Sequence, residues 1–356
     1  MGSRSRRGIP SALIIAGGRG TRFWPESRAE RPKPLFSIDG KTTLLDDTIA
    51  RLQPLVPRDR IFVLASADQA PAFRRAVKDS LPPRNLIVEP EGRGTAVAIT
   101  YGAAAIASRF GSETVVAVMP ADHHIAPAAG FRRTIADAAA LASSHDAIVV
   151  VGVTPARSET GYGYQKIGKT VGAGFRVERF IEKPPPALAQ KMVRSGKFLW
   201  NAGMFVMRTE TLAAELERHA PELADAMRRF GAIKPSALPS CYRTLQFDSF
   251  DRVVAEKSDN VLGVRAQFGW HDVGSWEGLW EALRGKGTNV ISGNAIALDS
   301  DGVLARAGKR LMVLIGVSDL VAVDTGDAIL IAQRSRSQEV RAAIDEMRRR
   351  GLDRYL

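Results

Sequence analysis

Short apolar runs rich in β-branched residues alternate with longer, helix-like segments through the first half of the chain. The short runs, each typical of a buried strand, occupy residues 12–16, 61–65, 85–89, 114–119 and 147–153. Between them, helical spacing of the apolar residues predicts helices at 43–53, 69–81, 95–110 and 131–144. This alternation predicts an α/β domain with a mainly parallel sheet, in which ligands bind at the carboxyl ends of the strands.

The second half of the chain is more mixed and ends in a region of different composition. Strand patterns occupy residues 161–168, 175–184 and 198–208, and a helix is expected around 209–230. After 284–289, short apolar runs separated by turn residues recur at 295–298, 303–305, 311–315, 320–323 and 328–331. We therefore predict a large α/β domain over residues 1–284 and a small β-rich domain over residues 285–356.

The small domain closes with a helix that carries an apolar stripe. Val340, Ala343, Ile344 and Met347 are spaced to lie on one face of this helix. The stripe predicts that the helix docks on the rest of the chain through that face.

The chain is strongly basic, which raises the question of a nucleic-acid partner. It has 356 residues, a formal net charge of +12 and a sequence pI near 10.1. The basic residues are spread over the whole length, and aromatic residues make up 7% of the chain. Blocks of basic residues interleaved with aromatics are absent, so we expect no nucleic-acid partner and attribute to the charge an attraction for polyanionic substrates.

Other bulk features favour a cytoplasmic protein. The longest apolar runs, such as 147–153, are far shorter than the roughly 20 residues of a membrane-spanning helix, and no membrane association is expected. The basic amino terminus has no apolar segment typical of a secretory signal and is expected to be a disordered tail. Cys241 is the single cysteine, so neither an intrachain disulfide nor a thiolate metal site is expected.

The first strand leads into the most distinctive stretch of the sequence, "AGGRGTRFWPESRAERPKPLF" at residues 16–36. Glycines allow backbone N–H groups to approach phosphate oxygens, and Arg22 offers a fork of donors for them. Pro32 and Pro34 restrict the backbone on either side of Lys33. The stretch predicts a phosphate site, and the structural alternative is a tight turn followed by a proline-rich surface loop.

Two common phosphate motifs do not fit this stretch. A dinucleotide fingerprint needs a third glycine where the chain has Phe23. A P-loop ending in Gly40, Lys41 and Thr42 needs a glycine where the chain has Leu35.

The stretch "AGGRGTR…WP…SR…PKPLF" resembles the signature of the sugar-1-phosphate nucleotidyltransferases. Its Trp24-Pro25 with Ser27-Arg28 is similar to the mannose-1-phosphate guanylyltransferase branch of that family. Further blocks resemble the family in the same order: "EPEGRGTA" (89–96), "MPADHHI" (119–125), "ETGYGYQKIG" (159–168), "VERFIEKP" (177–184), "WNAGMF" (200–205), "FGWHDVGSW" (268–276) and "DLVAVDTGDAILIA" (319–332).

The resemblance implies a Rossmann-like nucleotidyltransferase domain, of the GT-A-like type, followed by a domain similar to a fragment of a left-handed β-helix. It implies transfer of a nucleotide from GTP to α-D-mannose 1-phosphate, with release of pyrophosphate and participation of Mg²⁺ or another divalent cation. It also implies a homodimer. Such a reaction needs positioning and charge neutralisation more than a strong general base, because the attacking oxygen already belongs to a phosphate.

The resemblance also assigns roles to individual residues of this chain. The implied catalytic residues are Arg22, Lys33 and Lys183. The implied nucleotide-binding residues are Gly17, Gly18, Gly20, Thr21, Arg22, Glu89, Gly94 and Thr95. The implied sugar-phosphate-binding residues are Gly163, Glu182, Lys183 and Asn201, and the implied metal ligands are Asp122 and Asp272.

The sequence departs from the mannose branch at a few positions that bear on the base. Gly94 and Val97 stand where that branch has asparagine and proline, and Gly94-Thr95-Ala96 resembles the uridylyl branches. Pro34 stands where the mannose branch usually has glutamine. One alternative therefore stays open within the same chemistry: UTP or dTTP with glucose 1-phosphate. A second alternative, from another functional class, is a non-catalytic regulatory subunit that binds a sugar nucleotide.

Overall fold

A computed structural model describes residues 10–18, 20–28, 30–38 and 40–356, so the basic amino-terminal tail lies outside the described residues. The chain forms two compact units. Of the described residues, the large unit contains 10–17, 49–121 and 125–270, and the small unit contains 122–124, 271–356 and those between 18 and 48. Each unit is made of several separate segments of the chain. The predicted boundary between a domain over residues 1–284 and one over residues 285–356 therefore stays a prediction.

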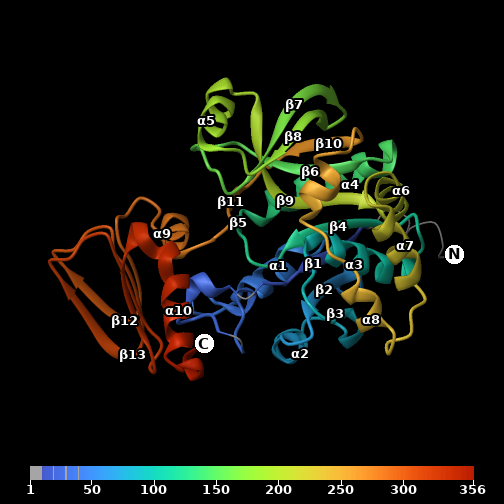
Figure 1. Cartoon of the computed structure of the whole chain (residues 1–356). Helices are drawn as coiled ribbons and strands as arrows, with labels where there is room; N and C mark the ends of the chain where they lie inside the picture. Colours follow the sequence, from blue (N-terminus) through green and yellow to red (C-terminus); the bar gives the residue numbers. More distant parts are fainter. Residues whose placement is uncertain (1–9, 19, 29, 39) are drawn as a thin grey trace. The chain divides into compact units, whose positions relative to one another are not determined.

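A nine-stranded sheet forms the centre of the large unit, with the order β3-β2-β1-β4-β9-β6-β10-β8-β7 (Figure 1). The registers place β8 and β9 antiparallel to their neighbours, while the other strands share one direction. The predicted α/β class with a mixed, mainly parallel sheet is confirmed. The strands are β1 (Ser11–Ile15), β2 (Ile61–Ser66), β3 (Leu86–Glu89), β4 (Val115–Pro120), β6 (Ile148–Val153), β7 (Gly163–Val171), β8 (Gly174–Glu182), β9 (Phe198–Arg208) and β10 (Val261–Arg265).

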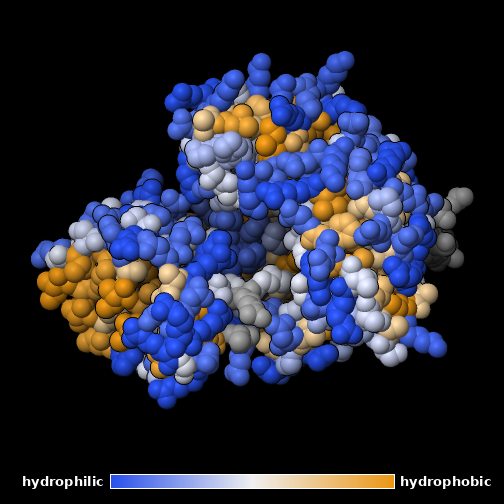
Figure 2. Space-filling view, viewed as in Figure 1, coloured by the Kyte–Doolittle hydropathy of each residue, from blue (hydrophilic) through white to orange (hydrophobic). Residues whose placement is uncertain are grey.

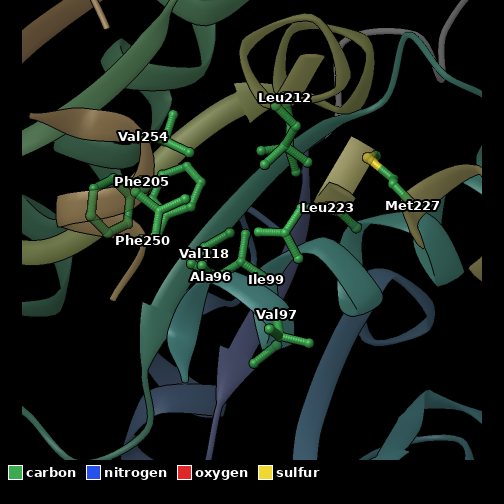
Figure 3. Packing of buried hydrophobic residues seen from close by; sticks show 14 of the residues in the cluster. Ala96, Val97, Ile99, Val118, Phe205, Leu212, Leu223, Met227, Phe250 and Val254 are labelled. Carbon is green, nitrogen blue, oxygen red and sulfur yellow. The ribbon is translucent and has the colours of Figure 1, made fainter. Parts of the chain in front are cut away.

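Helices and one apolar cluster pack on this sheet. Figure 3 shows side chains of α3, including Ile99, packed with Val118 of β4, Phe205 of β9 and Leu212 of α6. The cluster is continuous from the sheet to the helices, which holds the strand ends in fixed positions. The helices of the large unit are α2 (Ala70–Val77), α3 (Thr95–Phe110), α4 (Ala128–His145), α5 (Pro186–Ser195), α6 (Thr209–His219), α7 (Pro221–Phe230) and α8 (Leu238–Arg243), and α1 (Leu44–Leu52) has residues in both units.

The helix expected around 209–230 is two helices. α6 ends at His219 and α7 begins at Pro221, which occupies its first turn. Proline has no backbone N–H and clashes with the preceding helical turn, so a single continuous helix is interrupted there.

A four-stranded sheet, in the order β12-β13-β14-β15, belongs to the small unit. β12 pairs with β13 and β13 with β14 in parallel, whereas β15 is antiparallel to β14. The apolar runs predicted at 303–305 and 311–315 lie in one long strand, β13. The strands are β12 (Val290–Leu298), β13 (Leu304–Ile315), β14 (Leu320–Asp324) and β15 (Ile329–Gln333); β5 (His124–Ala126) and β11 (Gly269–His271) form a separate two-stranded sheet.

The helices α9 (Trp276–Leu283) and α10 (Val340–Arg349) complete the small unit. On α10, Val340 and Ile344 are buried as the apolar stripe predicts, while Ala343 is exposed. Within the described part of the chain, none of the helices is both long enough and apolar enough to span a membrane.

Candidate active site

The glycine-rich turn after β1 begins the candidate site. Gly18 and Gly20 have φ angles of +114° and +57°, a region that residues with a side chain seldom adopt. A Cβ on Gly20 would also lie 2.4 Å from the Cβ of Lys33, so only glycine fits there. The turn continues into a short 3₁₀ helix, Thr21–Phe23, which presents Arg22.

Lys33 is held almost buried at the start of a second 3₁₀ helix, Lys33–Leu35. Its Nζ donates to Asp122 Oδ2 at 2.6 Å and to the carbonyl oxygen of Asp272 at 3.0 Å. The ammonium group also lies 5.6 Å from the centre of the Phe23 ring. Pro32 precedes Lys33, and the side chain is therefore aimed by both its backbone and its partners, as the sequence predicts.

Arg22 is a cation without a carboxylate partner among the residues that the structure describes. Its Nη1 donates to the carbonyl oxygen of Gly274 at 3.3 Å. Because none of the described carboxylates neutralises its charge, the guanidinium group is suited to an anionic ligand.

These residues line one cavity of about 590 Å³, formed entirely by the small unit. The sequence resemblance implied seven of the residues around it: Gly18, Gly20, Thr21, Arg22, Lys33, Asp122 and Asp272. The others are Phe23, His123, Gly274, Arg341, Ile344, Asp345 and Arg348. The four on α10 were missed as cavity residues, because their signal in the sequence is a helical stripe with no motif of its own.

The two carboxylates implied as metal ligands are in the same cavity. Asp122 follows β4, and burial raises its pKa, but Lys33 and His123 together with hydrogen bonds hold the pKa below its ordinary value. Asp272 Oδ1 accepts a hydrogen bond from the backbone N–H of Gly274 at 3.2 Å. The described residues contain no cluster of three or more acidic, histidine or cysteine side chains able to hold a metal. Two carboxylates fit Mg²⁺, which commonly completes its coordination with substrate phosphates and water.

The residues implied to bind the sugar phosphate come together in the large unit. A Cβ on Gly163 would lie 2.7 Å from Glu182 Oε2 and 3.3 Å from the Cβ of Asn201. Lys183, at a φ of +49°, extends its Nζ to 2.8 Å from Glu182 Oε1. β7, β8 and β9 supply this group, which offers a carboxylate, an amide and an ammonium group around one glycine.

Asp251 also belongs to this cluster, and sequence reasoning missed it. Its Oδ1 accepts a hydrogen bond from Asn201 Nδ2 at 2.7 Å. Burial, and then the negative charge of Glu182, raises the pKa of Asp251 to about 7. It lies in a π-helical turn, Asp251–Ala255, far along the chain from β9, so no local pattern connects it with Asn201.

Glu89, implied to bind the nucleotide, is a buried carboxyl at the end of β3. Tyr242 donates its hydroxyl to Glu89 Oε2 at 2.7 Å, and a Cβ on Gly17 would lie 3.8 Å from Glu89 Oε1. Burial raises the pKa of Glu89 to about 7, although the Tyr242 hydrogen bond opposes the shift. Glu89 and Gly17 are thus neighbours, as a shared nucleotide site requires.

Gly94 caps the amino terminus of α3, and Thr95 is its first residue. Both lie against residues 247–250, which precede the π-helical turn. Gly94 has a φ of +89°, and a Cβ there would lie 2.6 Å from the carbonyl oxygen of Phe247. Thr95 Oγ1 accepts a hydrogen bond from the backbone N–H of Phe250 at 2.9 Å. The Thr95 hydroxyl therefore has a structural partner.

Comparison with protein families matches nearly the whole chain. The nucleotidyl transferase family model matches residues 11–288, and the MannoseP isomerase/GMP-like beta-helix domain model matches residues 293–347. The chain belongs to the nucleotidyl transferase family and is an enzyme of the nucleotidyltransferase class. The predicted β-helix-like carboxyl-terminal domain is confirmed.

Curated proteins and a solved structure are similar to this chain over almost its whole length. The xanthan biosynthesis protein XanB of Xanthomonas campestris pv. campestris is 35% identical over 95% of this chain and 73% of its own length. A mannose-1-phosphate guanylyltransferase of Escherichia coli (strain K12) is 34% identical over the same shares. A crystal structure from Thermus thermophilus, described as a mannose-1-phosphate geranyltransferase, is 35% identical with a TM-score of 0.88, covering 96% of this chain and 99% of that one.

Proposed function

We propose that the chain is a mannose-1-phosphate guanylyltransferase, which converts GTP and α-D-mannose 1-phosphate into GDP-mannose and pyrophosphate. The observation that carries this proposal is the arrangement of Arg22, Lys33, Asp122 and Asp272 around one cavity beside a glycine-rich turn. Guanylyltransferases among the relatives support the choice of base and sugar.

The proposed step is an in-line displacement at the α-phosphate of GTP. A phosphate oxygen of mannose 1-phosphate forms the new bond to this phosphorus, and the bond to the bridging oxygen of the β-phosphate breaks. The bonding electron pair leaves with pyrophosphate, so negative charge accumulates on the leaving group. Lys33 and Arg22 offset this charge from fixed positions, and the glycine-rich turn binds the triphosphate through backbone N–H groups.

Asp122 and Asp272 are the residues that would hold a divalent cation, and we propose Mg²⁺. When bound, the cation draws negative charge from the phosphates of the two substrates and so permits their approach. Lys33 already pairs with Asp122, and it keeps that carboxylate oriented toward the cavity.

Glu182, Asn201 and the backbone of Gly163 are proposed to bind the sugar hydroxyls, and Lys183 the sugar phosphate. The support is their proximity in the large unit and the polarity of the group. Asn201 is held by Asp251, which leaves its amide with a defined orientation.

An activity panel tests the proposed substrates. Four nucleoside triphosphates, each combined with mannose, glucose and galactose 1-phosphates, are incubated with the enzyme and Mg²⁺, and pyrophosphate release is measured. We expect GTP with mannose 1-phosphate to have the highest kcat/KM, and a chelator to abolish turnover. A preference for UTP or dTTP with glucose 1-phosphate would replace the proposed substrates, and binding of a sugar nucleotide without any turnover would support the regulatory subunit.

We also propose that the enzyme works in the cytoplasm as a homodimer joined through its small sheet. Figure 2 shows an apolar patch over the region of β12 and β13. Exposed apolar area of this extent on a folded domain is typical of a protein–protein interface. The large exposed apolar side chains of the described residues are Ile291, Ile296, Leu298, Leu311, Val313, Ile315, Ile329 and Ile331.

A further inference from the structure

The cavity has a second basic wall, supplied by the carboxyl-terminal helix and not by the glycine-rich turn. Arg341, Ile344, Asp345 and Arg348 of α10 line it. They recur at intervals of three and four residues, so they form one face of the helix. α10 therefore presents a continuous stripe of side chains to the cavity.

Ile344 anchors this stripe. It is 4% exposed and belongs to the same buried cluster as Phe23, and α10 packs against the Thr21–Phe23 turn. Figure 1 shows α10, in red, beside the blue segment that follows the first strand. Arg341 and Arg348 lie one turn before and one turn after the anchor, so both are held near the turn that presents Arg22.

Neither arginine is needed for a strong structural interaction. Both are exposed, and Arg341 forms no hydrogen bond or ion pair with the residues that the structure describes. Arg348 Nη1 pairs with Asp345 Oδ1 at 3.1 Å across one helical turn. An exposed pair of this kind contributes little to stability, so Arg348 exchanges partners readily.

The charges around the cavity leave these arginines available to an anion. Lys33 is paired with Asp122, whereas Arg22 and Arg341 have no carboxylate partner within the described residues. A guanidinium group binds two phosphate oxygens at once, and it keeps its charge at any physiological pH.

We propose that Arg341 and Arg348 bind the β- and γ-phosphates of the nucleoside triphosphate, and therefore the pyrophosphate that leaves. This inference rests on the proposed function, in which the glycine-rich turn binds the triphosphate and Arg22 and Lys33 offset the charge of the leaving group. The arginines of α10 add two further cations for the outer phosphates from the second wall of the same cavity. The two arginines offset the charge that the leaving oxygen gains, so the carboxyl-terminal helix is part of the substrate site.

The test compares Arg341→Gln, Arg348→Gln and the double variant with Arg349→Gln. Arg349 is an exposed arginine of the same helix that does not line the cavity, so its variant is matched in charge and position along the chain. Steady-state KM is measured for GTP and mannose 1-phosphate, and for pyrophosphate in the reverse reaction. Binding of pyrophosphate with Mg²⁺ is measured separately by calorimetry, and melting temperatures check the fold.

Each cavity variant is expected to raise KM for GTP and for pyrophosphate about tenfold, the effect of one lost charge-assisted hydrogen bond. KM for mannose 1-phosphate is expected to change by less than about twofold, and Arg349→Gln is expected to match the wild type. Unchanged KM and unchanged pyrophosphate affinity in the double variant would overturn the inference. Failure of the proposed function is a distinct result, because the wild type would then show no turnover. Calorimetry would still compare pyrophosphate binding by the wild type with that by the variants.

Discussion

Lys33 has the most constrained side chain of the candidate site. Its backbone follows Pro32, its Cβ faces Gly20, and its Nζ contacts Asp122 and Asp272 within 3.0 Å. A charge fixed in this way needs no reorganisation when substrate arrives, which is the property that makes a cation effective in phosphoryl transfer.

Lys33→Met is expected to lower kcat about 10²–10³-fold, the usual effect of removing one fixed electrostatic group from an active site. The variant keeps the length and the apolar stem of the side chain. Lys41→Met is the control, because Lys41 is an exposed lysine eight positions further along the chain that does not line the cavity. Pyrophosphate release under saturating substrates measures the effect. Equal losses in the two variants would contradict the assignment.

Glu89 makes the stability of the fold dependent on pH. Its pKa is raised to about 7 in the folded chain from an ordinary value of 4.5, because the carboxyl is buried and Asp68 adds negative charge. Between these values the folded state binds more protons than the unfolded state, so the free energy of unfolding falls as pH rises. The loss is complete above about pH 7 and amounts to about 3 kcal/mol.

Glu89→Gln is therefore expected to remove this loss, so that the variant gains stability relative to the wild type at pH 8 but not at pH 5. Tyr242→Phe is the opposing variant, because it deletes the hydrogen bond that lowers the pKa of Glu89. Its stability is expected to fall more steeply with pH. Urea unfolding at several pH values measures both, and a Glu89→Gln profile parallel to that of the wild type would refute the idea.

Among the elements, β13 fixes the segment that carries Lys33. Arg306 of β13 is buried; its Nε pairs with Glu26 at 2.8 Å, and its other nitrogens donate to the carbonyl oxygens of Ile38 and Ser37. Its guanidinium carbon also lies 4.7 Å from the centre of the Phe36 ring. The small sheet therefore supports the loop on both sides of Lys33.

Arg306→Met is expected to lower the free energy of unfolding by about 3 kcal/mol, because it leaves the Glu26 carboxylate, which is only 12% exposed, without its partner. It is also expected to lower kcat, since the loop around Lys33 loses its support. Lys309→Met is the control on the same strand, because this exposed lysine forms no side-chain hydrogen bond or ion pair with the residues that the structure describes. The control is expected to lose about 1 kcal/mol at most. Denaturant unfolding and activity at saturating substrate separate the two effects.

At the scale of the whole molecule, residues from both ends of the chain share one cavity. Gly18 and Arg22 come from the first strand's turn, and Arg341 and Arg348 come from the last long helix. In the proposed function, the small unit is thus a catalytic part of the enzyme in addition to presenting an exposed apolar sheet.

A charge in the apolar sheet is expected to convert the enzyme to a monomer. Ile315 and Ile331 are 64% and 69% exposed, so Asp at either position disturbs no buried packing in the single chain. Light scattering after size-exclusion chromatography is expected to give twice the chain mass for the wild type and a single chain mass for the variants. Lys169→Asp, an exposed substitution on β7, is the control. A monomeric wild type at micromolar concentration would refute the proposed dimer.

Local patterns in the sequence determined most of the elements and the nature of the chemistry. The strand predicted at 198–208 matches β9, which follows the turn at Gly196 and ends where α6 begins at Thr209. The glycines and prolines around Arg22 and Lys33 predicted a phosphate site, since these residues act on their own backbone within a few positions. The same residues carried the resemblance that family comparison confirmed.

Tertiary structure alone decided which distant residues complete the sites. Asp251 lies 50 positions from Asn201, and Arg22 lies 252 positions from Gly274, so no local periodicity relates them. The stripe on α10 predicted a docking face through Val340, Ala343, Ile344 and Met347, but no pattern in the sequence singled out the arginines beside it. Their proposed role in phosphate binding follows from the elements that α10 packs against. A cavity forms only when the chain folds, because the side chains that line it come from segments far apart in the sequence.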